Sequence, residues 1–153
     1  MSLRVELVDQ SNWEDIINLT VDSNQVSFIE SNACSIIESH YTAGWYPLGL
    51  YSEEALVGFA MYGCYENDSV WLDRFMIDER YQGQGFGHSF LVYLLEHLQT
   101  QFKIKKILLS FTPENTYARI FYERHGFFNT NEVDSKGELI FMYNCSEVYN
   151  VRY

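Results

Sequence analysis

The chain has 153 residues, the size of one domain that can bury a large core without cross-links. Hydrophobic residues make up 47% of the sequence, which excludes an intrinsically disordered segment. Ten Lys and Arg residues against 21 Asp and Glu residues give a net charge of -11, which disfavours nucleic acid as a partner.

The spacing of cysteines and histidines argues against disulfides and metal sites. Cys34, Cys64 and Cys145 form no short-spaced pair, and the histidines lack the spacing of metal ligands. No apolar run approaches the roughly 18 residues of a membrane span, and no basic segment precedes an apolar run at the amino terminus. We therefore expect a single cytoplasmic domain over residues 1–153, with no metal and no membrane partner.

The amino-terminal third predicts one strand and two helices. Residues 3–7 alternate between apolar and polar side chains, as in a half-buried strand. Residues 11–14, SNWE, have the pattern of a capping box that begins a helix. After an irregular segment at 24–31, a second helix is expected, which Gly44 can end. One face of this helix would consist of Ala33, Ile36, Ile37, His40 and Tyr41.

The middle of the chain predicts an antiparallel meander and then a β-loop-α-β unit. Three apolar segments separated by polar breaks predict strands at 48–51, 55–65 and 70–77. Glycine-rich residues 83–87 lead into a helix, and a strand follows at 106–111. Because a helix connects 70–77 to 106–111, these two strands should be parallel. The helix has a broad apolar stripe, formed by Phe90, Leu91, Leu94, Leu95, Leu98 and Phe102.

The carboxy-terminal part predicts a short helix and a β-hairpin. Asn115 can cap a helix over 116–125, and Gly126 follows its end. The hairpin would pair 127–133 with 138–143. The complete order predicts a mixed α/β domain with a largely antiparallel central sheet flanked by helices.

A glycine-rich loop occupies residues 80–87, RYQGQGFG. Glycines let consecutive N–H groups turn toward one anion at the start of a helix, so the loop can bind a pyrophosphate or be a tight connection without a ligand. A dinucleotide fingerprint would need a glycine where the chain has His88. A nucleoside-triphosphate loop would need Gly-Lys-Ser/Thr, which does not follow Gly83.

The loop resembles the Gln/Arg-x-x-Gly-x-Gly/Ala motif of the GNAT superfamily of N-acetyltransferases, with Arg80, Gly83 and Gly85 in the defining positions. Asn115 and the segment ARIFYERHGF, residues 118–127, are similar to the family's second signature. The resemblance extends over roughly residues 3–143. It implies the GNAT acyl-CoA N-acyltransferase fold and acetyl-CoA as cosubstrate.

The resemblance also implies where the cofactor binds. Met76 and Ile77 would offer backbone groups to the pantetheine arm, and Asn115 would contact the arm or an ordered water. The pyrophosphate would be held by the loop and the first helical turn, which comprise Gln82, Gly83, Gln84, Gly85, Phe86, Gly87 and His88. By physical reasoning alone, Ile77 could equally be a core residue and Asn115 a helix cap.

Two residues are candidates for catalysis. Tyr122 matches the family tyrosine that protonates the departing thiolate, although an aromatic core residue would look the same. Strand alternation places Asp73 on one apolar face with Trp71, Phe75 and Ile77. Such an acid is either structurally paired or takes a proton from an ammonium substrate, directly or through water. Arg74 would point to the other face as an ion-pair partner.

The acceptor is implied by a narrower resemblance. Segments 28–31, 57–63 and 71–75 look like those of the spermine/spermidine acetyltransferases of Gram-positive bacteria. This implies a polyamine acceptor, bound by Phe28 and Glu30 beside Asp73, direct transfer, and a homodimer. Further candidates, for which a solvated surface is the ordinary interpretation, are Glu38, Tyr41 and Glu66.

Two alternatives stay open. The acceptor could be another small amine or a protein amino group. The chain could also be a noncatalytic acyl-CoA-binding module, which would need the phosphate loop but neither Asp73 nor Tyr122.

Overall fold

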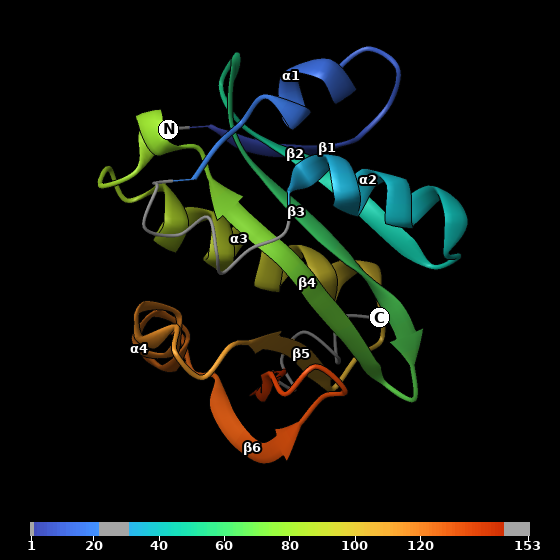
Figure 1. Ribbon diagram of the computed structural model, residues 1–153, viewed down its shortest axis with the longest axis vertical. Coiled ribbons are helices and arrows are strands. Elements are labelled where there is room, and N and C mark those ends of the chain that lie inside the picture. The colour runs from blue at the N-terminus through green and yellow to red at the C-terminus, as the bar shows by residue number, and fades with distance from the viewer. Residues whose placement is uncertain (1, 22–30, 146–153) are drawn as a thin grey trace.

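The computed structural model describes residues 2–21 and 31–145 (Figure 1). In these residues, one seven-stranded sheet has the order β1-β2-β3-β4-β5-β7-β6. The strands are β1 (Leu3–Leu7), β2 (Trp45–Ser52), β3 (Ala55–Glu66), β4 (Ser69–Ile77), β5 (Lys106–Phe111), β6 (Phe128–Val133) and β7 (Leu139–Asn144). The helices are α1 (Trp13–Ile17), α2 (Asn32–Tyr41), the short η2 (Glu79–Tyr81), α3 (Phe86–Gln101) and α4 (Thr116–Arg124).

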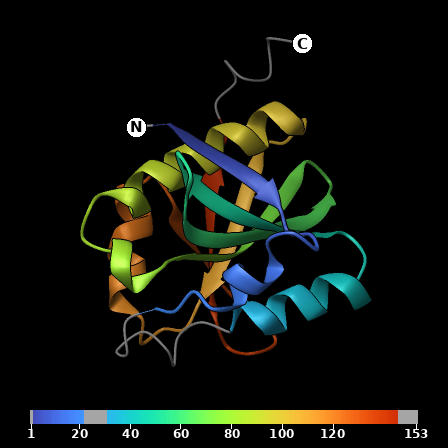
Figure 2. The ribbon, with the colours of Figure 1, turned by 90° about the horizontal axis from the view of Figure 1, so that it is seen from above.

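The predicted fold class is confirmed. Every neighbouring pair in the sheet is antiparallel except β4 and β5, which are parallel as the β-loop-α-β order requires. Helices α1 and α2 lie on one face of the sheet and α3 lies on the other (Figure 2). In the described part of the chain, no helix is both long and apolar enough to cross a membrane.

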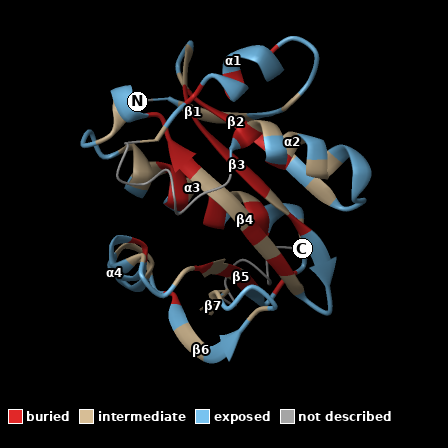
Figure 3. Cartoon of the chain, viewed as in Figure 1, coloured by how far each residue is buried: buried red, intermediate tan, exposed pale blue. Residues whose placement is uncertain are grey.

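The sheet separates two buried clusters, and its central strands are the most deeply buried (Figure 3). The larger cluster packs α3 against the sheet, and the predicted stripe supplies Phe90, Leu91, Leu94 and Leu98, all fully buried. The smaller cluster lies under α1 and includes Ile16 and Met76. The 3.6-residue period of α3 therefore predicted its buried face correctly.

The predicted capping box at the start of α1 is wrong. The backbone N–H and the hydroxyl of Ser11 both donate to the Asp9 carboxylate, at 2.8 and 2.6 Å, which lowers the pKa of Asp9. Asn12 occupies the N-cap position, but its side chain accepts from the Asp9 N–H rather than from the helix. Ser11 is thus engaged by the preceding turn and is not available to cap α1.

The predicted apolar face of α2 is buried only in part, since Ile36 packs against the smaller cluster. The helix buries Asn32 and Ser35, whereas Ile37 is 58% exposed and Tyr41 is 87% exposed. The reason is tertiary, because β4 presents the polar side chain of Arg74 to this helix and α2 meets it with polar residues. The helix ends at Tyr41 with Thr42 as its C-cap, before Gly44.

A β-bulge changes the direction of side chains along β4. Met61 of β3 is opposite Arg74 but Tyr62 is opposite Leu72, so β4 has one extra residue, Asp73. Leu72 faces the larger cluster before the bulge, and Phe75 faces it after the bulge. The alternation that would place Asp73 and Trp71 on one face with Phe75 therefore does not hold.

Strands β4 and β5 separate soon after they pair. Their parallel register covers Ser69 to Trp71 of β4 against Lys106 to Leu108 of β5. Beyond these residues, the carboxy-terminal half of β4 has β3 beside it on one side and an opening on the other. The opening lies at the carboxyl ends of two parallel strands, which is where α/β proteins commonly bind ligands.

Candidate active site

The opening between β4 and β5 is part of a cavity of about 860 Å³. Residues from β4, the glycine-rich loop, the end of β5, α4 and the β6–β7 connection line it. Eight of the predicted catalytic and cofactor-binding residues are among them, namely Asp73, Met76, Ile77, Gln82, Gly83, Gly87, Asn115 and Tyr122. The structure therefore brings residues of both sequence motifs to one cavity.

The glycine-rich loop is held by a buried carboxylate. Asp78, which is 2% exposed, accepts hydrogen bonds from the Arg80 backbone N–H, the Arg80 Nε and the Thr20 N–H. Burial raises the pKa of Asp78, but these hydrogen bonds outweigh it and leave the pKa below its ordinary value. The motif arginine thus ties the loop to the end of β4.

The loop backbone suits an anion. Gly83 and Gly85 have φ values of 74° and 86°, in the left-handed region that glycine adopts without strain. The Gln82 side chain donates to the Ile77 carbonyl at 2.9 Å and folds the loop against β4. The first N–H groups of α3 follow directly, and such groups have no acceptor within their own helix.

The other predicted phosphate-site residues lie at this helix start, outside the cavity lining. The Phe86 ring packs against Tyr81 and Phe90, and its backbone N–H lies in the first turn of α3. Gln84 is exposed, and its side chain donates to the Arg80 carbonyl. His88 is exposed and lies 2.8 Å from His125 of the α4 C-cap.

Tyr122 and Asn115 are positioned by α4. Asn115 is the N-cap of α4, and its side-chain oxygen accepts from the Ala118 N–H at 3.1 Å. The Tyr122 ring packs against Phe111 and Phe127, and burial raises its pKa well above the ordinary value. The phenol therefore stays protonated at neutral pH and can act as a hydrogen-bond donor.

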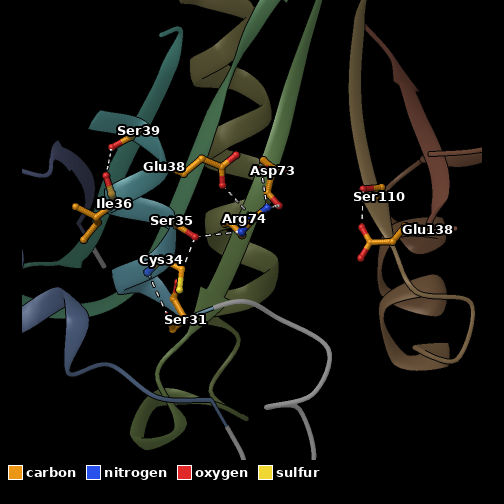
Figure 4. Close-up of polar contacts among 10 residues, drawn as sticks. All are labelled: Ser31, Cys34, Ser35, Ile36, Glu38, Ser39, Asp73, Arg74, Ser110 and Glu138. Atoms are coloured by element: carbon orange, nitrogen blue, oxygen red, sulfur yellow. Dashed lines mark hydrogen bonds and ion pairs between the residues drawn. The ribbon is translucent and has the colours of Figure 1, made fainter. Parts of the chain in front are cut away.

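One wall of the cavity carries a charged network around Arg74 (Figure 4). Its guanidinium lies 2.5 Å from the Asp73 carboxylate and 3.3 Å from the Glu38 carboxylate. The Arg74 Nε also donates to the Ser35 hydroxyl at 3.1 Å. The expected ion-pair role of Arg74 is confirmed, although Asp73 and Arg74 are partners instead of pointing to opposite faces.

The opposite wall has polar residues that the sequence did not single out (Figure 4). The Ser110 hydroxyl of β5 donates to the Glu138 carboxylate at 3.0 Å. Asp134 accepts from the backbone N–H groups of Lys136 and Glu138 and so shapes the turn that carries Glu138. No local pattern marks Glu138 as a site residue, because only the β5–β7 pairing brings it to the cavity.

The Thr112 hydroxyl adds a binding opportunity on this side. Thr112 lines the cavity, and its buried hydroxyl has no hydrogen-bond partner among the described residues. A buried polar group left in this state is costly, so a ligand or water that reaches it would be favoured.

The remaining predicted acceptor residues have different outcomes. Glu38 lines the cavity, whereas Tyr41 and Glu66 are exposed and, within the described chain, do not. Phe28 and Glu30 lie outside the described residues. In the described ranges, no cluster of three or more His, Cys, Asp or Glu side chains could hold a metal ion.

Comparison with known proteins places this geometry in a family. Residues 13–127 match the model of the Acetyltransferase (GNAT) family. The spermine/spermidine N(1)-acetyltransferase of Bacillus subtilis (strain 168) is 42% identical over 147 residues, which are 92% of this chain and 97% of that protein. A probable spermine N(1)-acetyltransferase of Bacillus subtilis subsp. natto (strain BEST195) is 40% identical, with the same coverage.

Solved structures share the fold at lower identity. The spermidine N-acetyltransferase from Vibrio cholerae, in complex with CoA and spermine, has a TM-score of 0.72 and 19% identity, over 93% of this chain and 95% of that chain. The PaiA N-acetyltransferase from Thermoplasma acidophilum, in complex with coenzyme A, has a TM-score of 0.70 and 17% identity, over 95% of this chain and 100% of that chain.

Proposed function

Because this chain belongs to the acetyltransferase (GNAT) family, we propose that it transfers an acetyl group from acetyl-CoA directly to a primary amine of a polyamine such as spermidine or spermine. One observation carries the proposal. The cavity between β4 and β5 brings both family motifs together and has carboxylates on two facing walls. The similarity to the Bacillus subtilis spermine/spermidine enzyme supports the choice of acceptor.

The residues at the cavity edge fit acetyl-CoA, which supplies the activated thioester. Gly83 and Gly85 allow the loop N–H groups to converge on a pyrophosphate, and Gly87, His88 and the other residues of the first helical turn extend that site. Because β5 does not pair with β4 beyond Trp71, the backbone around Met76 and Ile77 borders the cavity instead of another strand. That edge suits the amide groups of a pantetheine arm.

The acceptor side fits a chain with several ammonium groups. Glu38 and Asp73 stand on one wall and Glu138 on the other, so separate cationic groups can each meet a carboxylate. Trp45, Phe75 and Tyr117 add aromatic surface for the alkyl spacers between those groups. Phe28 and Glu30 stay candidates for the same role by resemblance.

The proposed chemistry needs one proton acceptor and one proton donor. Asp73 would take the proton of the bound ammonium, directly or through water, so that the neutral nitrogen can attack. Tyr122 would donate a proton to the departing thiolate, and the second proton that the nitrogen loses on forming the amide would return to the phenolate, directly or through water. Burial favours the protonated phenol. No nucleophilic side chain is required, because the amine itself attacks.

The proposal extends to a single cytoplasmic domain that forms a homodimer. Cys34, Cys64 and Cys145 are free cysteines, which suits a reducing compartment. Ile37 and Tyr41 of α2 are exposed, and a second copy of the chain could cover them. Sedimentation velocity tests the oligomeric state, and a monomer across the accessible concentration range would contradict the dimer.

The deciding experiment is steady-state release of free coenzyme A from acetyl-CoA with spermine, spermidine and unrelated primary amines, including amino-terminal peptides. Saturable turnover confined to polyamines is the expected result. Turnover only with another amine would rule out a polyamine as the acceptor but would support acetyl-CoA as the cosubstrate. Binding of acetyl-CoA without turnover for any amine would favour the noncatalytic module.

A further inference from the structure

Two histidines join the two motifs of the cofactor site. His88 lies in the first turn of α3, and His125 is the C-cap of α4. The His88 Nδ1 is 2.8 Å from the His125 Nε2, which is a hydrogen bond between the two rings. The contact therefore connects the helix that begins at the phosphate loop with the helix that carries Tyr122.

The hydrogen positions of this pair follow from its partners. The His125 Nδ1 lies 2.7 Å from the Phe121 carbonyl oxygen, which can only accept, so this nitrogen carries a hydrogen. The hydrogen bond between the rings contains one hydrogen. In the neutral pair, that hydrogen belongs to the His88 Nδ1, and the lone pair of the His125 Nε2 accepts it.

An anion at the helix start selects one form of His88. Phosphate oxygens at neutral pH mostly accept hydrogen bonds, so His88 can bind a phosphate through Nε2–H, on the side of the ring away from His125. A ring with hydrogens on both nitrogens is the imidazolium cation rather than the neutral form; in that cation the Nδ1–H needs an acceptor, and the His125 Nε2 is that acceptor. The second histidine thus fixes the orientation of the His88 ring and supplies the acceptor that the anion-binding cation needs.

The packing of α3 against α4 holds the two histidine rings in position. The Phe121 ring packs against His125 in a tilted arrangement, with 4.6 Å between ring centroids. A Cβ atom built on Gly87 would meet the same Phe121 ring at 3.6 Å, so the first turn of α3 packs directly on α4. A shift of α4 would therefore move His125 relative to His88.

We propose that His125 is a positioning residue for recognition of the pyrophosphate of acetyl-CoA, acting through His88. This inference rests on the proposed function, which puts the pyrophosphate at the start of α3. It goes beyond a cap of α4, which would need the His125 Nδ1 contact with Phe121 but no contact with His88. Pyrophosphate affinity should then depend on a side chain that need not touch the cofactor.

The test compares coenzyme A with pantetheine, which shares the arm but lacks the pyrophosphate, by titration calorimetry. His125→Ala should weaken coenzyme A binding about fivefold, the effect of losing one hydrogen bond, and leave pantetheine binding unchanged. His125→Gln, whose side-chain oxygen can accept from His88, should recover most of the loss. His97→Ala, at the other end of α3, is the matched control and should behave as wild type.

A double mutant tests whether His125 acts through His88 or only stabilises the fold. His88→Ala with His125→Ala should bind coenzyme A no more weakly than His88→Ala alone, because both changes remove the same contact. Equal weakening of coenzyme A and pantetheine in His125→Ala, or unchanged coenzyme A affinity in that variant, would overturn the inference. Failure of the wild-type protein to bind coenzyme A would instead reject the proposed function.

Discussion

The Asp73 carboxylate lies 2.5 Å from the guanidinium of Arg74, the next residue in the sequence. Neighbouring residues of a regular strand point to opposite faces, so this contact depends on the bulge in β4. The same bulge puts Asp73 beside the cavity, with Arg74 linked to Glu38 of α2. Asp73 is therefore both an ion-pair partner of Arg74 and a residue of the cavity wall.

Asp73→Asn should lower polyamine turnover about 100-fold or more, as expected for loss of a general base. The loss should be largest at lower pH, where fewer amines are already neutral. The measurement is the pH profile of kcat/KM for spermidine, with thermal unfolding as a control for folding. A small loss that is the same at every pH would assign Asp73 to structure alone.

Tyr122→Phe should reduce kcat with little change in coenzyme A affinity, because it removes the proposed proton donor and keeps the ring packing. Tyr117→Phe, on the same helix and also lining the cavity, is the matched control and should retain activity. Rapid-quench turnover and calorimetry provide the two measurements. Equal turnover of Tyr122→Phe and wild type would remove Tyr122 from the donor role.

Tyr122 should also affect alkaline stability. Its pKa is raised in the folded protein, so its contribution to stability is present below its unfolded pKa and is lost as pH rises above about 10 toward the folded pKa. As the pH rises from about 9 to about 11, the free energy of unfolding, measured with denaturant, should fall more for wild type than for Tyr122→Phe. Other groups with raised pKa, such as Tyr62 and Cys145, are present in both proteins and cancel in the comparison. Parallel pH profiles would contradict the prediction.

Glu138→Gln should raise the KM for spermine about tenfold, because a charge-assisted contact becomes a weaker neutral one. The KM for acetyl-CoA should stay the same. Ser110→Ala should have a smaller effect in the same direction, since Ser110 only orients the carboxylate. Glu66→Gln, an exposed carboxylate that does not line the cavity, is the control. Identical spermine KM values for Glu138→Gln and Glu66→Gln would exclude the cavity wall that carries Glu138 from acceptor binding.

Leu94→Ala should destabilise the protein by about 2 to 5 kcal/mol, because Leu94 is fully buried in the larger cluster and its loss leaves a cavity. Val92→Ala, two residues earlier in α3 at a position 46% exposed, should change stability by only about 0.5 kcal/mol. Urea unfolding of both variants measures the difference. Similar losses of unfolding free energy in the two variants would show that the apolar stripe of α3 stabilises the core no more than its exposed face does.

Features that depend on residues close together in the sequence could be predicted from the sequence alone. The stripe of α3, the strand Lys106–Phe111 and the parallel order of β4 and β5 follow from residue periodicity and chain order. The glycines of the phosphate loop follow from backbone conformation, since positive φ at Gly83 and Gly85 suits glycine. The resemblance to the family rested on these same local motifs.

Other features exist only when distant segments meet in space. The buried face of α2 depends on Arg74 of β4, and the Glu138 carboxylate reaches the cavity because β7 pairs with β5. The His88–His125 contact likewise requires α3 and α4 to pack together. Local periodicity records which side chains can be buried, but the partner across the interface decides whether a polar or an apolar face is the one that packs.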